Sequence, residues 1–229
     1  MNITEIKQKI ENGAFDKDST MLYGDVSAAR VRYTAACDSF CGIFPERDGI
    51  RLFSAPGRTE VGGNHTDHQH GCVLAGGVNL DVIAIVAPNV DNKVRIKSEG
   101  YDMDVIDIAE LEKNEAEHGR ASALIRGVLS RFKELGCALS GFNAYTTSNV
   151  LKGSGLSSSA AFEVLVGNIV NGMFFEAKAD EITVAKIGQY AEREYFGKPC
   201  GLLDQMASSL GGFTSVSYTH LRAHETKAN

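Results

Sequence analysis

The sequence predicts a mixed fold in which β-strands and α-helices share a hydrophobic core. Runs rich in valine and isoleucine, above all residues 72–88, are typical of buried strands, whereas residues 119–135 have the apolar spacing of an amphipathic helix. Hydrophobic residues make up 43% of the 229 residues and charged residues 23%, as in globular proteins long enough to bury a sizeable core. The class is therefore α/β or α+β.

The expected elements follow one another with few gaps. Residues 3–13 and 25–43 have helical apolar spacing, and a strand over 50–55 ends at the turn signal Pro56-Gly57. The buried strand over 72–88 bends at Gly76-Gly77. We then expect a hairpin of strands 93–100 and 103–108, a helix over 119–135, a strand over 141–150, and helices over about 158–175, 180–196 and 203–210.

The net charge and the cysteines indicate which partners and which cellular compartment the protein is expected to have. The net charge of −6 leaves no basic stripe for a nucleic acid, although one small anionic ligand needs only a local site. The five cysteines are scattered and form no CxxC pair, which indicates a reducing compartment. No apolar run resembles a signal peptide or reaches the length of a membrane span, so we expect a cytoplasmic protein.

The last residues differ from the rest of the chain. Residues 216–229 have no continuing apolar period and resemble an adapter-derived scar, so we expect a non-native tail. The alternative is a short, disordered native C-terminus.

The first segment whose residues suggest a binding site is rich in serine and glycine and runs from Lys152 to Ala161. It follows a predicted strand and opens an apolar helix, whose positive N-terminal end points at the same place as the backbone amides of the small residues. An anion such as a phosphate fits that arrangement, although the pattern of a Walker A loop is absent. A flexible turn with a serine N-cap is the structural alternative.

The second segment, residues 57–70, is densely polar between two strands. Arg58 can neutralise phosphate charge, and Asn64, His65 and Asp67 can hydrogen-bond a polyhydroxylated ligand. A solvated loop is one alternative. A metal site is another, built from His65, Asp67, His68 and His70.

The third segment, residues 197–205, places Asp204 after a glycine-rich turn. On its own, such an aspartate is most often an N-cap or a surface residue. Glu192, twelve residues earlier on the preceding predicted helix, is most often part of a solvated face.

In this order and spacing the three segments resemble the galactokinase branch of the GHMP small-molecule kinases. GRTEVGGNHTDHQHG is similar to the galactokinase signature, KGSGLSSSAA to the second family motif, and GKPCGLLDQ to the segment that carries the catalytic aspartate. The resemblance implies an α+β fold, namely that of the GHMP kinase N-terminal domain. This fold is a mixed sheet with helices on one face, and it is similar to the second domain of a small-subunit ribosomal protein. The resemblance covers about residues 20–214 of a family whose members are commonly twice as long. We therefore expect the C-terminal domain to be missing and this chain alone to turn over little substrate. The expected division is a helical extension over 1–45, the kinase N-terminal domain over 46–215 and the tail over 216–229.

The resemblance also implies roles for single residues. Asp204 is the catalytic carboxylate beside the anomeric hydroxyl of the sugar, and Arg58 stabilises charge on the transferred phosphoryl group. Ser158 or Ser159, with Glu192, holds Mg²⁺. The residues implied to cradle the nucleotide phosphates are Gly153, Ser154, Gly155, Leu156, Ser157, Ser158 and Ser159. Those implied to contact the sugar are Asn64, His65, Asp67, Cys200 and Gly201.

The implied function is an ATP-dependent sugar-1-kinase that phosphorylates galactose and uses Mg²⁺. Asn64 stands where the usual signature has glutamate, Glu60 where it has asparagine and His68 where it has tyrosine, so a related sugar such as N-acetylgalactosamine is an alternative. A non-catalytic sugar and nucleotide sensor is a second alternative, and the intact Ser159-Ala160-Ala161 favours the enzyme over it. A mevalonate or homoserine kinase is a third, against which GNHTDH and CGLLDQ argue.

Overall fold

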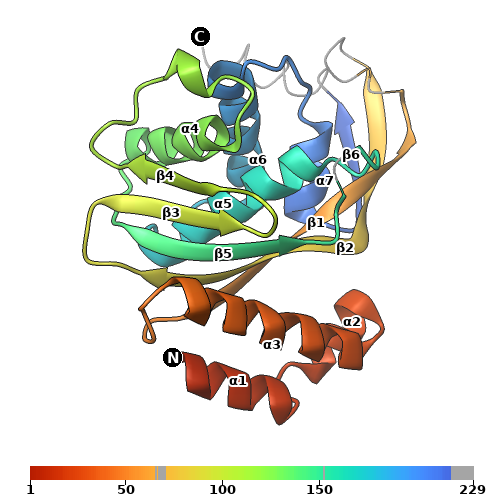
Figure 1. Cartoon of the computed structure of the whole chain (residues 1–229). Coiled ribbons are helices and arrows are strands. Elements are labelled where there is room, and N and C mark those ends of the chain that lie inside the picture. The colour runs from red at the N-terminus through yellow and green to blue at the C-terminus, as the bar shows by residue number, and fades with distance from the viewer. Residues whose placement is uncertain (65, 67–70, 152, 218–229) are drawn as a thin grey trace.

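The computed structural model describes residues 1–64, 66, 71–151 and 153–217, and it confirms the mixed α+β class (Figure 1). Asp67, His65 and the other histidines of the polar loop lie outside the described residues, as does most of the expected tail. None of the described helices combines the length and apolar composition that a membrane crossing requires.

One six-stranded sheet organises the chain, with strand order β1-β2-β5-β3-β4 and β6 pairing with β2. Every pair of neighbouring strands is antiparallel except β3 with β5, which run parallel, so the sheet is mixed as the family resemblance implies. The strands are β1 (Arg51–Gly62), β2 (Cys72–Pro88), β3 (Lys93–Ser98), β4 (Met103–Asp107), β5 (Phe142–Ser148) and β6 (Phe213–Ser217).

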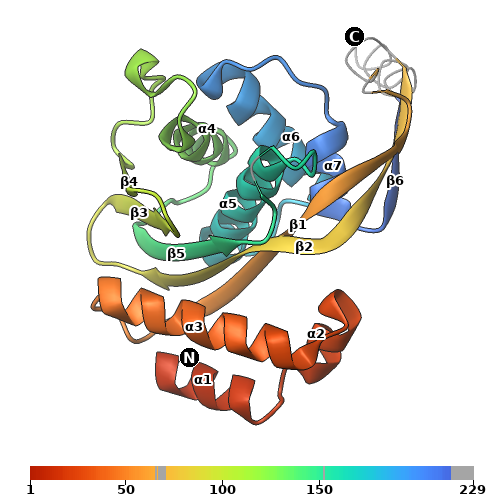
Figure 2. The same ribbon diagram turned by 45° about the vertical axis from the view of Figure 1, so that its right-hand side comes forward.

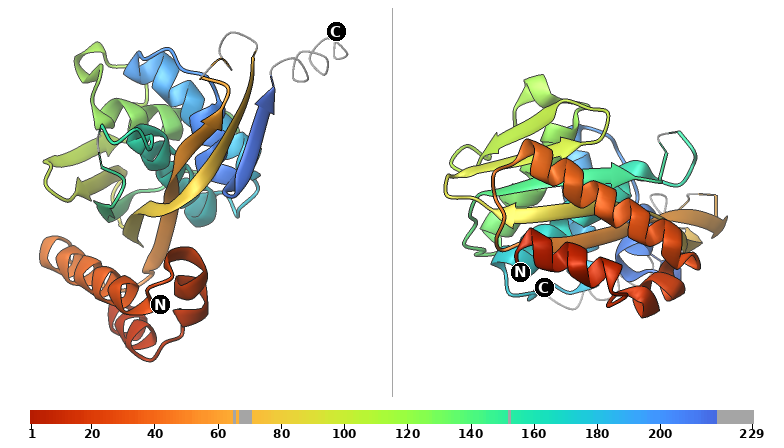
Figure 3. Two further views of the ribbon diagram at one scale, coloured as in Figure 1. Left: turned by 90° about the vertical axis from the view of Figure 1, so that its right-hand side faces the viewer. Right: turned by 60° about the horizontal axis from the view of Figure 1, so that its bottom comes forward.

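Helices cover both faces of this sheet (Figures 1 and 2). The kinase-like part supplies one layer, consisting of α4 (Ala121–Glu134), α5 (Ser158–Phe174), α6 (Glu181–Tyr190) and α7 (Leu203–Leu210). The N-terminal extension supplies the other, consisting of α1 (Ile3–Glu11), α2 (Asp16–Tyr23) and α3 (Val26–Ile43). The right-hand view of Figure 3 shows α1 and α3 running across the outer face of the sheet. The described residues also include the 3₁₀ turn η2 (Glu115–Glu117) and the π-helical turn η3 (Ala191–Phe196), which continues α6.

Burial on both faces explains why the sequence of strand β2 is apolar almost without interruption. Ala84 and Val86 face the core shared with α4, α5 and α6, whereas Ile83, Ile85 and Ala87 face the core under α1 and α3. Successive side chains of a strand point to opposite faces, so a strand buried on both faces has no polar alternation.

Three details differ from the sequence-based expectation. The turn expected at Pro56-Gly57 is wrong, because β1 continues to Gly62 and only its register shifts, between Pro56 and Arg58. Proline lacks an N–H to donate, and a bulge accommodates it without ending the strand. Helix α2 and strand β6 were not expected. The tail boundary expected at 216 falls inside β6, where Val216 is buried against β2.

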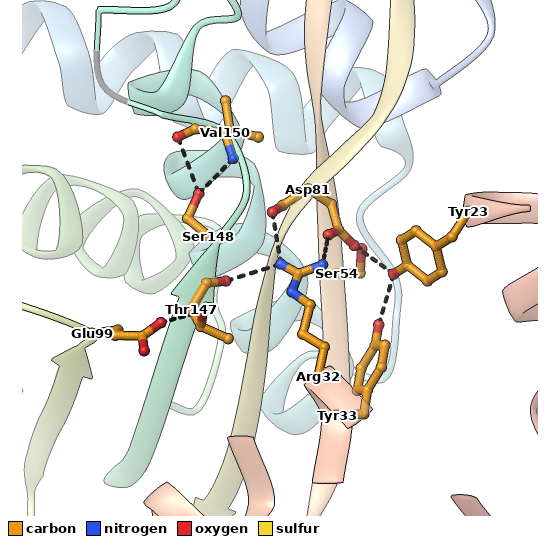
Figure 4. A network of polar contacts seen from close by, with 9 residues as sticks. All are labelled: Tyr23, Arg32, Tyr33, Ser54, Asp81, Glu99, Thr147, Ser148 and Val150. Carbon is orange, nitrogen blue, oxygen red and sulfur yellow. Dashed lines mark hydrogen bonds and ion pairs between the residues drawn. The ribbon is translucent and has the colours of Figure 1, made fainter. Parts of the chain in front are cut away.

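A buried carboxylate fastens the N-terminal helices to the sheet (Figure 4). Asp81 on β2 is 3% exposed and pairs with Arg32 of α3. It also accepts hydrogen bonds from the hydroxyl of Tyr23 on α2, at 2.6 Å, and from Ser54 on β1. The Arg32 guanidinium donates further to the backbone carbonyls of Asp81, at 2.9 Å, and Thr147 on β5, at 3.3 Å. One charge pair therefore joins two helices to three strands.

We expect Asp81→Ala to lower the free energy of unfolding by about 3–5 kcal/mol, because it leaves the charge of Arg32 buried without its partner. Urea denaturation followed by circular dichroism measures the change. The matched control is Asp38→Asn, which removes the exposed ion pair between Lys7 and Asp38 and should barely move the midpoint. Equal midpoints for the two variants would contradict the anchoring role of Asp81.

Candidate active site

A cavity of about 480 Å³ opens where β1 meets the N-terminal ends of α5 and α7. It gathers three chain segments that are far apart in the sequence, namely Arg58, the loop before α5, and the segment from Lys198 to Asp204. The predicted site residues that line it are Arg58, Gly153, Gly155, Ser157, Ser158, Ser159, Cys200, Gly201 and Asp204. A second hollow of about 220 Å³, between the N-terminal helices and β1, contains none of the predicted residues.

An ion pair forms one wall of the cavity. Nε of Arg58 donates to Oδ1 of Asp204 at 2.7 Å, and Nη1 of Arg58 donates to the carbonyl of Gly155 at 2.7 Å. The second carboxylate oxygen, Oδ2, accepts from the hydroxyl of Ser157. The Arg58 side chain is only 6% exposed, whereas that of Asp204 is 23% exposed. Arg58 is thus buried and held by two acceptors, whereas the side chain of Asp204 is partly exposed and lines the cavity.

Local backbone geometry brings Arg58 to this position. The shifted register after Pro56 lets the Arg58 amide donate to the carbonyl of Leu156 at 3.0 Å. Gly57 permits that approach, because a β-carbon there would lie 3.0 Å from the same carbonyl and 3.1 Å from the side chain of Val150. The turn signal in the sequence therefore marks close contact between β1 and the loop, not the end of β1.

The loop before α5 leaves the start of that helix without a side-chain cap. Ser157 occupies the N-cap position at φ 57°, a left-handed conformation, and its side chain makes no capping hydrogen bond. Its hydroxyl bonds Asp204 instead. The hydroxyl of Ser154 is also engaged, since it donates to the carbonyl of Leu151 at 2.7 Å. The side chain of Ser157 therefore does not accept a hydrogen bond from the N–H groups in the first turn of α5. These N–H groups form the positive end of the helix dipole, next to Ser158 and Ser159, which line the cavity.

Glu192 lies beside the lining, with only 1% of its area exposed, and is not part of a solvated face. Its Oε1 accepts from the hydroxyl of Ser159 at 3.0 Å and from Nζ of Lys198 at 2.9 Å, while its Oε2 accepts from Gln205 at 2.8 Å. It is held in the π-helical turn η3, a geometry that is frequent at functional sites.

The hydroxyl oxygen of Ser159 and the carboxylate oxygen of Glu192 fit a magnesium ion. A hydroxyl and a carboxylate oxygen 3.0 Å apart are the hard oxygen ligands that Mg²⁺ prefers, and Mg²⁺ usually takes its remaining ligands from water and phosphate. Consistent with such a partial ligand set, the described residues contain no group of three or more His, Cys, Asp or Glu side chains that could enclose a metal.

Some predicted residues are not brought to the cavity. Asn64 is exposed just beyond the end of β1, at φ 50°, and does not line it. His65 and Asp67 lie outside the described residues, and so does the whole of the alternative metal site. Asp204 is inside the first turn of α7, whose N-cap is Leu202, so the N-cap interpretation of Asp204 is wrong.

Sequence reasoning missed three polar residues around Glu192. Lys198 lines the cavity, and Gln205 and Glu163 are buried beside Glu192. Burial alone would lower the pKa of Lys198, but its hydrogen bond to Glu192 and the negative charges of Glu192 and Asp204 together raise the pKa. Burial raises the pKa of the Cys200 thiol, and the negative charge of Glu192 raises it further, so Cys200 is a neutral thiol. The signal in the sequence was position, since Lys198 and Gln205 belong to the same motif as Asp204.

Glu163 on α5 is a second buried acid in this region, 1% exposed like Glu192. Burial raises its pKa well above the usual value, and the neighbouring charge of Glu192 adds to the effect. Its Oε2 accepts from Gln205 at 3.0 Å. The raised pKa favours the protonated, neutral form of Glu163.

Comparison with known proteins supports the same family as the three motifs. The family model of the GHMP kinase N-terminal domain matches residues 123–212, and that of the galactokinase galactose-binding signature matches residues 38–88. Galactokinases of Bacillus subtilis (strain 168) and Lactobacillus helveticus are 33% and 36% identical to the chain over 75% and 73% of its length. The chain spans 44% of each of these proteins, somewhat under half.

Solved structures agree on the fold. The crystal structure of Lactococcus lactis galactokinase complexed with galactose superposes with a TM-score of 0.72 at 25% identity, covering 82% of this chain and 52% of that one. The mevalonate kinase of Methanococcus jannaschii superposes with a TM-score of 0.62 at 16% identity, covering 75% of this chain and 55% of that one, which supports the fold alone. The predicted GHMP-type α+β fold is confirmed.

We expect Glu163→Gln to change how stability depends on pH. A carboxyl whose pKa is raised in the fold contributes stability that is fully present below its unfolded pKa, about 4.3, and is lost as pH rises toward its folded pKa. The unfolding free energy of the wild type should therefore fall relative to that of Glu163→Gln as the pH rises above about 4.3, by up to about 1.4 kcal/mol per pH unit. Urea unfolding at several pH values measures it, and parallel curves would show that Glu163 is ionised.

Proposed function

The chain belongs to the GHMP kinases and carries the galactose-binding signature of galactokinases, and we propose on that basis that the protein is an ATP-dependent sugar-1-kinase that converts galactose to galactose 1-phosphate. The observation that supports it most is the ion pair of Arg58 and Asp204 in a cavity lined by the glycine- and serine-rich loop of α5. A carboxylate, a guanidinium and an uncapped helix start are the parts that phosphoryl transfer needs, because that reaction depends on positioning and electrostatics and needs no covalent nucleophile.

Asp204 acts on the sugar hydroxyl. Its side chain is 23% exposed and lines the cavity, while Arg58 and Ser157 hold its two oxygens in a fixed orientation. A hydroxyl of the sugar placed against it donates its proton toward the carboxylate as the oxygen attacks the terminal phosphorus of ATP, and the bond from that phosphorus to the bridging oxygen breaks as ADP leaves. Arg58 lies beside the same position and stabilises negative charge on the transferred group.

The loop and the start of α5 receive the phosphates of ATP. The backbone amides from Gly153 to Ser159 supply donors, and the glycines at φ 80° and 78° give the loop a conformation that other residues rarely adopt. Ser158 or Ser159, with Glu192, holds Mg²⁺, which when bound neutralises phosphate charge. Lys198 adds a positive charge at the same edge of the cavity.

The sugar contacts follow from the signature loop and the segment before α7. Cys200 and Gly201 line the cavity next to Asp204, and Asn64, His65 and Asp67 are proposed from their positions in the signature. An amide at Asn64 both donates and accepts hydrogen bonds, whereas the usual carboxylate only accepts. Galactose remains the proposed substrate, and N-acetylgalactosamine is the related sugar to compare with it. The scattered cysteines support a cytoplasmic setting.

We expect Asp204→Asn to lower kcat by about 10²–10⁴-fold, because an amide cannot take the proton of the sugar hydroxyl. The assay is sugar-dependent ADP formation by the full-length product of the gene that encodes this chain, with galactose binding measured by calorimetry. Galactose affinity should change little. Asp38→Asn, an exposed carboxylate far from the cavity in sequence, is the control and should keep full activity. A fully active Asp204→Asn variant would exclude Asp204 as the base.

The choice of sugar is tested by comparing kcat/KM for galactose, glucose and N-acetylgalactosamine in the same assay. We expect galactose to be preferred. A preference for N-acetylgalactosamine would assign the protein to the related sugar. Binding of ATP and galactose without any ADP formation would instead identify a non-catalytic sensor.

A further inference from the structure

Three polar side chains are buried together beside the cavity. Glu163 on α5 and Glu192 in η3 are each 1% exposed, and Gln205 on α7 is completely buried. None of the three lines the cavity. Buried polar groups are costly unless they are hydrogen-bonded, so a cluster that joins three separate elements calls for a specific role.

Gln205 bridges the two acids with a single nitrogen. Its Nε2 donates to Oε2 of Glu163 at 3.0 Å and to Oε2 of Glu192 at 2.8 Å. A side-chain amide has two N–H groups, so both are used. Both hydrogen bonds end on the Oε2 atoms, which leaves Oε1 of Glu192 to Ser159 and Lys198.

We propose that Gln205, itself held by Glu163, is a positioning residue that turns the Glu192 carboxylate toward Ser159 for the binding of Mg²⁺-nucleotide. The proposal rests on the proposed function, because it concerns the oxygen that Glu192 offers to the metal. Without the amide, the Glu192 side chain loses the one described hydrogen bond that fixes its buried end, and the carboxylate can rotate away from Ser159.

Packing around the cluster supports a fixed arrangement. Gly188 on α6 faces it, and a β-carbon at that position would lie 3.2 Å from Cγ of Gln205 and 3.3 Å from Oε2 of Glu163. These distances are shorter than ordinary van der Waals contacts, so even one methyl group there would press on both side chains. A β-carbon there would therefore displace Gln205 or Glu163 by a few tenths of an ångström.

The state of Glu163 fits the same role. Burial and the charge of Glu192 raise its pKa, so the bridge joins one neutral acid to one carboxylate and avoids two buried negative charges. Two buried acceptors, Oε1 of Glu163 and Oε1 of Gln205, have no hydrogen-bond donor among the described residues. Protonation of Glu163 turns one of these acceptors into a donor.

The experiment compares nucleotide binding with and without metal in the full-length gene product. Calorimetry measures the affinity for a non-hydrolysable ATP analogue with Mg²⁺, and again with EDTA in place of Mg²⁺. Gln205→Met keeps the length of the side chain but removes both donors. We expect its affinity for the Mg²⁺-bound analogue to fall by about tenfold or more, and its affinity for the metal-free analogue to change by less than about twofold.

Two variants of Glu163 test whether Gln205 needs an acceptor at this position. Glu163→Gln keeps an oxygen that accepts from Gln205 and carries no charge, so we expect its Mg²⁺-dependent affinity to stay within about threefold of the wild type. Glu163→Met removes the acceptor and should weaken Mg²⁺-dependent binding in the same direction as Gln205→Met. Thermal melts confirm that each variant is folded.

If Gln205→Met does not fold, Gly188→Ala decides, because it changes no polar group and acts only by pressing on Gln205 and Glu163. It should weaken Mg²⁺-dependent binding selectively and to a smaller extent. Equal losses with and without Mg²⁺, or no loss in the folded variants, would overturn the positioning role while leaving the kinase proposal intact. A wild-type protein that binds no nucleotide under either condition would instead overturn the proposed function.

Discussion

The burial of Arg58 is the constraint on which the arrangement of the site depends. Its guanidinium is 6% exposed, and a charge so far removed from water requires acceptors placed around it. The structure supplies the Asp204 carboxylate from α7 and the Gly155 carbonyl from the loop before α5. Strand β1, that loop and α7 must therefore approach one another closely, and the cavity is the space left where they meet.

Much of this could be predicted from the sequence because it depends on local patterns. The apolar period located α4 and α7, and the three motifs located Arg58 and Asp204 although 146 positions separate them. Pro56-Gly57 was misread because a proline in a strand and a proline in a turn give the same local signal. The antiparallel partner decides between them, and here Pro56 pairs with Asp81 of β2. Strand β6 was missed for a similar reason, because only pairing with β2 turns a short polar stretch into a strand.

The cluster beside Glu192 illustrates a different limit. Glu163 lies within an apolar helical stretch of α5, where a lone glutamate is ordinarily assigned to the exposed face. Its burial results from the approach of α6 and α7, which only the folded structure shows, and Gly188 is the residue that makes room for that approach. Gln205 directly follows Asp204 within the third motif, yet its two hydrogen bonds reach 42 and 13 positions back along the chain. No pattern within a single element carries information of this kind.

The charges around the cavity combine into a simple balance. The raised pKa of Glu163 favours its neutral form, and the described carboxylates of Glu192 and Asp204 are paired with the cations of Lys198 and Arg58. Charges paired in this way offer a polyphosphate little net attraction. The backbone amides at the start of α5, and a cation that accompanies the phosphates, add attraction that does not depend on these four side chains. An ionised Glu163 would add a negative charge beside Glu192, so the burial of Glu163 bears on the binding chemistry as well as on the core.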